Sequence, residues 1–172
     1  NSSSGHQNAT VGTGRGGHLQ IVAKEAIMIS GAAGHKPNSG LVSNVFTAGK
    51  GGMIEVSTPK MEIQDNGTIQ DGTQGDGNAG NISLNVERLS IQQGGFVTTE
   101  SKAAGEAGTI RITADNLTLH QGAVTSQADQ AGGGNIFIKG NGRFYLVNST
   151  ISARAQGEQP HHKGGNLQIE HP

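Results

Sequence analysis

The chain has no cysteine and no tryptophan, and aromatic residues make up only 3% of its 172 positions. The missing cysteines exclude disulfides and thiolate metal sites. No apolar run is long enough for a membrane helix, and the opening residues lack the basic and hydrophobic regions of a signal peptide, so neither is expected here. A net charge of -1 gives no electrostatic footprint for nucleic acid or for an anionic membrane.

Glycine is abundant, with 29 residues, whereas apolar residues reach only 32%. Such a low apolar fraction cannot fill a broad globular core and is typical of disordered chains. Two features oppose disorder, because the charges nearly cancel and the apolar residues recur at regular intervals. The length is typical of one domain, so a single structural unit is expected.

The regular intervals come from a repeat. Six segments begin with glycine and continue with two aliphatic residues at alternate positions, as GHLQI, GMIEV, GNISL, GTIRI, GNIFI and GNLQI. The glycines that open them are Gly17, Gly52, Gly80, Gly108, Gly134 and Gly165. Successive starts lie 35, 28, 28, 26 and 31 residues apart. A period of this length predicts a repeat architecture.

Each complete repeat contains three short stretches in which apolar residues alternate, which is typical of strands with one buried face. The first stretch gives two inward columns: Leu19, Ile21, Ile54, Val56, Ile82, Leu84, Ile110, Ile112, Ile136, Ile138, Leu167 and Ile169. The second gives the pairs Ile27/Ile29, Met61/Ile63, Leu89/Ile91, Leu117/Leu119 and Phe144/Leu146. The third gives one column: Val42, Ile69, Val97, Val124 and Ile151.

These columns predict an all-β fold, a parallel solenoid with three short strands per rung, about five full rungs and one extra strand. A sandwich of antiparallel hairpins would not place apolar residues in columns that repeat at this spacing. The glycines listed above are expected at corners, as are Gly40, Gly67, Gly95 and Gly122 before the third stretch. There they would supply positive φ and close backbone approach.

The repeat also divides the chain. Residues 1–13 are assigned to an irregular N-terminal segment and residues 14–171 to a single solenoid domain, with loop inserts at 30–40 and 153–165. The stretch GGNIFIKGNGRFYLVNSTISARAQGEQPHHKGGNLQI resembles the repeats of filamentous haemagglutinin-type exoproteins, the secreted partners of bacterial two-partner secretion systems. The resemblance covers about residues 14 to 171 and rests on Gly-Gly-Asn, the paired aliphatic residues and Gly/Ser-x-Ile/Val.

That resemblance implies a right-handed parallel β-helix, export across both membranes of a Gram-negative envelope, and adhesion or surface display. The secretion-directing N-terminal cap of the family has no match here, so the chain resembles a piece of the repetitive shaft. We therefore expect a secreted, extracellular rod segment of a surface adhesin or of a self-stacking filament. Its expected partners are stacked copies or further rungs, and glycans or proteins of a host or surface.

The alternative function is a carbohydrate-active β-helix enzyme of polysaccharide lyase or hydrolase type, which would need clustered carboxylates. Outward positions of the first stretch are Gln20, Glu55, Ser83, Arg111, Phe137 and Gln168, and those of the second are Met28, Glu62, Ser90, Thr118 and Tyr145. Neither series stacks two carboxylates, and Glu55 and Glu62 lie on different faces of one rung. No catalytic residue is assigned, and the chain is not expected to be an enzyme.

Other polar residues are weaker candidates for binding. Asp65, Asp71 and Asp76 lie in or near DGTQGDGN, which is similar to the turns of calcium-binding solenoids but occurs once, so a polar corner is expected instead. In the long inserts, solvated side chains are expected rather than ligands at His35, Lys36, His161 and His162. No metal or cofactor is therefore expected.

Three surface features complete the prediction. Phe137 and Tyr145 are taken as the only outward-pointing aromatic residues, forming at most a small apolar spot. The threonines Thr98, Thr113 and Thr125 are too irregular for an ice-binding ladder. Asn-x-Ser/Thr sequons, attributed to turn chemistry, occur at Asn8, Asn66, Asn81, Asn116 and Asn148.

Overall fold

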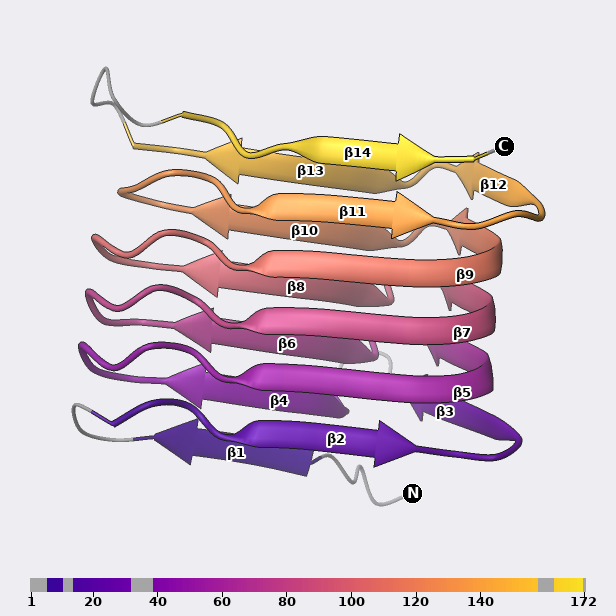
Figure 1. Cartoon of the computed structure of the whole chain (residues 1–172), viewed down its shortest axis with the longest axis horizontal. Coiled ribbons are helices and arrows are strands. Elements are labelled where there is room, and N and C mark those ends of the chain that lie inside the picture. The colour runs from indigo at the N-terminus through magenta and orange to yellow at the C-terminus, as the bar shows by residue number, and fades with distance from the viewer. Residues whose placement is uncertain (1–5, 11–13, 32–38, 158–162, 172) are drawn as a thin grey trace.

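The computed structural model describes residues 6–10, 14–31, 39–157 and 163–171. They form an all-β, parallel solenoid in which the chain climbs rung by rung (Figure 1). Strands at the front of Figure 1 point to the right and those at the back to the left as the chain rises, which makes the coil right-handed. The predicted fold class is confirmed. Within the described ranges no helix has the length and apolar character needed to cross a bilayer.

The strands form two sheets in which all pairs are parallel. The six-stranded sheet contains, in spatial order, β1 (His6–Thr10), β4 (Gly40–Val45), β6 (Thr68–Thr73), β8 (Phe96–Ser101), β10 (Ala123–Ala128) and β13 (Thr150–Ala155). The eight-stranded sheet contains β2 (His18–Val22), β3 (Ala26–Ser30), β5 (Met53–Gln64), β7 (Asn81–Gln92), β9 (Thr109–His120), β11 (Asn135–Lys139), β12 (Phe144–Val147) and β14 (Leu167–Glu170). Each rung pairs with the next along the coil.

The first two stretches of a rung are continuous in the middle of the solenoid. There each forms one bent strand of 12 residues, β5, β7 or β9, instead of two separate strands. In the first and last rungs the stretches separate, as β2 and β3 and as β11 and β12. The register gives the reason: His18 pairs with Met53 and Ala26 with Lys60, so the bend of the first rung holds one extra residue that interrupts the pairing.

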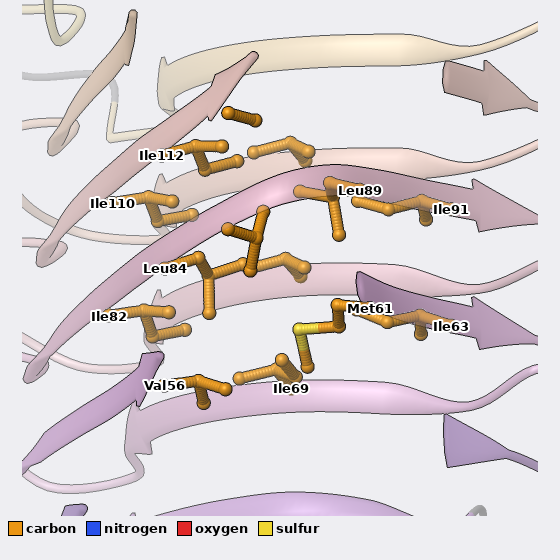
Figure 2. Packing of buried hydrophobic residues seen from close by; sticks show 14 of the residues in the cluster. Val56, Met61, Ile63, Ile69, Ile82, Leu84, Leu89, Ile91, Ile110 and Ile112 are labelled. Carbon is orange, nitrogen blue, oxygen red and sulfur yellow. The ribbon is translucent and has the colours of Figure 1, made fainter. Parts of the chain in front are cut away.

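The core lies between the two sheets and consists of stacked aliphatic side chains. In the first column Leu19, Ile54, Ile82, Ile110, Ile136 and Leu167 are in register. Figure 2 shows the middle of this core, where Ile82 and Ile110, and Leu84 and Ile112, lie one above the other. Side chains of the middle rungs are buried, whereas Leu167 and Ile169 in β14 are 46% and 47% exposed.

The third-stretch column differs from the prediction in its first member. Leu41, not Val42, pairs with Ile69, and Leu41 is only 8% exposed while Val42 faces outward beside Gln70. The prediction placed Gly40 at the corner, but the Thr68 N–H donates to the carbonyl of Ser39, just as the Phe96 N–H donates to that of Gly67. Serine therefore occupies the corner position in the first rung, as Ser149 does in the last.

The corner glycines are explained by close approach and not by positive φ. Among the described residues positive φ occurs at Asp65, Asn66, Gln93, Gly94, Gln121 and Asn148, and at none of the predicted corner glycines. A Cβ on Gly108 would lie 1.6 Å from the Gly80 carbonyl oxygen, and one on Gly134 would lie 1.8 Å from that of Gly108. Adjacent rungs thus meet backbone to backbone along this corner.

Two predicted boundaries are also corrected. The N-terminal segment expected to be irregular contains β1, which pairs in parallel with β4 through its backbone although it offers no aliphatic pair. The insert expected at 153–165 starts later, because β13 continues to Ala155 and keeps its register with β10. Residues 32–38 and 158–162 of the two inserts lie outside the described residues.

Replacing Gly108 by alanine is expected to destabilise the solenoid by about 2 kcal/mol or more. The new methyl group would collide with the Gly80 carbonyl in the adjacent rung, and that backbone cannot move without disturbing the pairing of its own rung. Gly132 provides a matched control, since the nearest atom to a Cβ there would be 3.7 Å away. Thermal or urea unfolding followed by circular dichroism measures both variants. Equal stabilities of Gly108→Ala and Gly132→Ala would contradict the backbone contact.

Candidate functional site

A polar column runs through the interior beside the aliphatic ones. It consists of residues of the third strands that are all 0% exposed: Ser43, Asp71, Thr99 and Ser126. The Thr99 hydroxyl donates to the Ser126 oxygen over 2.8 Å, and the Ser126 hydroxyl donates to the Gly108 carbonyl over 2.8 Å. This column faces the corner glycines, since a Cβ on Gly134 would lie 2.2 Å from the Ser126 oxygen.

Asp71 is the one carboxylate in this column. Its Oδ1 accepts a hydrogen bond from the Gly52 N–H at 3.3 Å, while its buried Oδ2 has no partner among the described atoms. Burial raises the pKa of Asp71 to about 7, against the opposing effects of the Gly52 and Gly80 N–H groups and the Ser43 hydroxyl. Asp71 lies inside β6 and faces the interior, so the expectation that it belongs to a polar corner is wrong.

On the outer face of the six-stranded sheet, polar side chains form a bonded ladder from rung to rung. The Arg154 guanidinium donates to the side-chain oxygen Oε1 of Gln127 at 3.2 Å, and the side-chain amide Nε2 of Gln127 donates to Glu100 at 2.8 Å. Beside it, the Thr125 hydroxyl donates to the Thr98 oxygen at 2.9 Å. These contacts join β8, β10 and β13 across their outer face.

Lys102 links two carboxylates at one end of this ladder. Its ammonium group contacts Glu100 directly and lies 3.6 Å from an oxygen of Asp129. The hydrogen bond to Glu100 is the main cause that raises the pKa of Lys102. Both carboxylates thus share one cation, and the cluster of Glu100, Lys102, Asp129 and Arg154 has no net charge.

A shallow groove of about 600 Å³, called here the axial groove, lies on this face over β6, β8 and β10. Its lining includes Gln70, Phe96, Thr98, Glu100, Thr125 and Gln127. Gln121 and Asn148, which also line it, have positive φ and belong to the corner turns at one side. Polar groups and an aromatic ring converge in the axial groove, and we take it as the candidate functional site.

The axial groove was missed at the sequence level. Phe96 faces outward and is half-buried in the groove, and Phe46 is 43% exposed, so Phe137 and Tyr145 are not the only outward aromatic residues. The signal was present, because Phe96 precedes Val97 of the inward column and so must face outward. The ladder lies on the third stretch, and of the outward residues there only Thr98 and Thr125 enter the prediction.

The outward carboxylates found by sequence reasoning have basic neighbours. Glu55 lies 2.8 Å from His18, and Glu62 lies 3.3 Å from Lys60. Asp65 accepts a hydrogen bond from the Ser30 hydroxyl at 3.0 Å, and Asp76 is exposed. In the part of the chain that is described, no three His, Asp or Glu side chains are placed to hold a metal ion. His35, Lys36, His161 and His162 lie outside it.

The remaining surface candidates also have structural neighbours. The Arg111 guanidinium lies 5.3 Å from the centre of the Phe137 ring, and Tyr145 is 53% exposed. Thr98 and Thr125 are outward-facing neighbours on adjacent strands of the six-stranded sheet, whereas Thr113 lies on the eight-stranded sheet. Side-chain oxygens of Asn81 and Asn116, two of the sequon residues, accept the N–H groups of Thr109 and Arg143 in the next rung.

Comparisons of this chain with protein-family models, with curated proteins and with solved structures found no match.

Proposed function

We propose that the chain is a non-catalytic rod segment of a secreted bacterial surface exoprotein of filamentous haemagglutinin type. The observation that carries this proposal is that residue types repeat from rung to rung at inward positions but not at outward ones. Inward positions repeat from rung to rung, as Ile54, Ile82 and Ile110 do, and so do the corner glycines. Outward positions in the same strands change freely, as from Glu55 to Ser83 and Arg111. Repetition that is confined to the interior supports a role in building the rod.

The polar surface supports a structural role over an enzymatic one. Glycosidases use two carboxylates that face the scissile bond, one of them as an acid. In the described chain two carboxylates, Glu100 and Asp129, are bridged by Lys102. Glu55 and Glu62 each have a separate basic neighbour. Each of these four carboxylates thus contacts a basic side chain in its own rung or in a neighbouring one.

Export and surface display belong to the same proposal. The resemblance of the repeats to filamentous haemagglutinin-type shafts supports it, and a chain without cysteine needs no disulfide chemistry on its way out of a cell. The proposed location is extracellular, with the rod holding binding surface away from the cell. Adhesion to glycans or proteins would then occur along its sides.

We also propose that further rungs, or other copies of the chain stacked end to end, cover the ends of the rod. Leu146, Leu167 and Ile169 form an exposed apolar end, being 44%, 46% and 47% exposed. The outer edge of β14 carries backbone groups that can pair with another strand, and an open edge with apolar side chains favours such pairing. A head-to-tail contact of this kind generates an open filament.

Light scattering across a concentration series tests the rod and its stacking. The particle mass is expected to rise with concentration for the parent chain and to stay constant for an Ile169→Lys variant. Thr113→Lys, on the exposed side of β9, serves as the matched control and should stack like the parent. A parent chain that remains one size at every concentration would contradict stacking without affecting the fold.

A further inference from the structure

The axial groove combines an aromatic ring with uncommitted amide groups. Phe96 is half-buried and leaves part of its ring accessible. Among the described residues, the side chains of Gln70, Gln121 and Asn148 line the groove and form no hydrogen bond with the protein. Each amide offers both donors and an acceptor to a ligand. Binding sites commonly combine apolar surface with a few such polar groups.

The charges of the groove favour an uncharged ligand. Glu100 is its only ionisable lining residue, and it belongs to the cluster with Lys102, Asp129 and Arg154 that has no net charge. Nucleic acids and sulfated polymers would gain no favourable phosphate or sulfate contact there. A peptide that binds by adding a strand needs an open sheet edge, but the floor is the face of paired strands β6, β8 and β10.

We propose that the axial groove binds an unbranched, neutral oligosaccharide that lies along the rod axis. The Phe96 ring would pack against the C–H face of one sugar, and the amides of Gln70, Gln121 and Asn148 would bind hydroxyl groups. Stacked strands repeat about every 4.8 Å, close to the length of one sugar unit in an extended chain. Successive rungs would therefore meet successive sugars. This proposal rests on the adhesive part of the proposed function.

Nuclear magnetic resonance of the isotope-labelled chain tests the proposal with defined probes. The neutral probes are cellohexaose, β-1,4-mannohexaose and chitohexaose, and a heparin hexasaccharide is the charged one. At least one neutral probe is expected to shift the side-chain amide signals of Gln70, Gln121 and Asn148. Phe96→Ala should weaken that binding at least tenfold. Phe46→Ala, which removes an exposed ring outside the groove, should bind like the parent.

The outcomes separate this inference from the rod itself. Three results would each overturn the oligosaccharide site. They are no shift of the side-chain amide signals with any neutral probe, equal binding by Phe96→Ala and the parent, and a preference for the heparin hexasaccharide. The backbone spectrum of Phe96→Ala shows whether the variant keeps its fold, and Gln70→Ala with Gln121→Ala gives a second test if it does not. If the chain stacks in light scattering but binds no neutral probe, the rod proposal stands and the oligosaccharide proposal is wrong.

Discussion

Replacing Ile112 by aspartate is expected to unfold the solenoid. Ile112 is 1% exposed and lies in register between Leu84 and Ile138, in the centre of the core. A carboxylate there would have no hydrogen-bond donor or cation facing it, and burying an unpaired charge is among the most destabilising changes known. The expected loss is above about 4 kcal/mol, a large part of the total stability of a typical domain.

Thr113→Asp is the matched control, because it places the same side chain one position along, on the exposed face of β9. Thermal unfolding followed by circular dichroism should show a cooperative transition for Thr113→Asp close to that of the parent. Ile112→Asp should show none, or a strongly lowered midpoint. If both variants melted with the parent, the inward assignment of this column would be wrong.

Asp71→Asn is expected to make the rod more stable at neutral and alkaline pH. The folded chain raises the pKa of Asp71 to about 7, above the ordinary value of 3.8, so between these values only the folded state holds the proton. The free energy of unfolding of the parent therefore falls as pH rises from about 4 to about 7 and levels off above. This loss amounts to at most roughly 4 kcal/mol. Asparagine has no proton to lose, so it removes the loss.

Urea unfolding at a series of pH values measures this difference. The stability gain of Asp71→Asn over the parent should be small at pH 4 and should grow to its full size by pH 8. Asp76→Asn, which alters an exposed carboxyl, is the control and should follow the parent at every pH. A gain that does not change with pH would show that Asp71 is not buried as the folded structure indicates.

The core of this fold was predictable from the sequence because one aliphatic residue must cover another in every rung. The alternation around Ile82, Ile110 and Ile136 has no other explanation at that spacing, and the register follows from it. Register was less certain where the repeat carries an insert. Residues 32–38 precede the third strand of the first rung. After this insert the prediction puts Gly40 at the corner where the structure has Ser39, so the predicted inward column contains Val42 instead of Leu41.

The candidate site was less predictable, because it depends on which way single polar residues face. A polar corner is the prediction for Asp71, because DGTQGDGN is similar to the turns of calcium-binding solenoids but occurs only once. Its place two positions after Ile69 in a strand points it inward instead. Glu100 and Lys102 lie in one rung and Asp129 in the next, and their contact appears only when the third strands are stacked in register. Alternation gives the direction of a side chain, but the polar contacts between rungs require the structure.

Turnover of polysaccharides is the measurement that tests most directly whether the rod is non-catalytic. The purified chain would be incubated, with calcium present, with pectate, cellulose, chitin, mannan and hyaluronan, and new reducing ends and unsaturated products would be measured. The expected result is no product above that of the unfolded Ile112→Asp variant. Turnover that disappears in Glu100→Gln while the variant stays folded would contradict a purely structural role and would identify the axial groove as an active site.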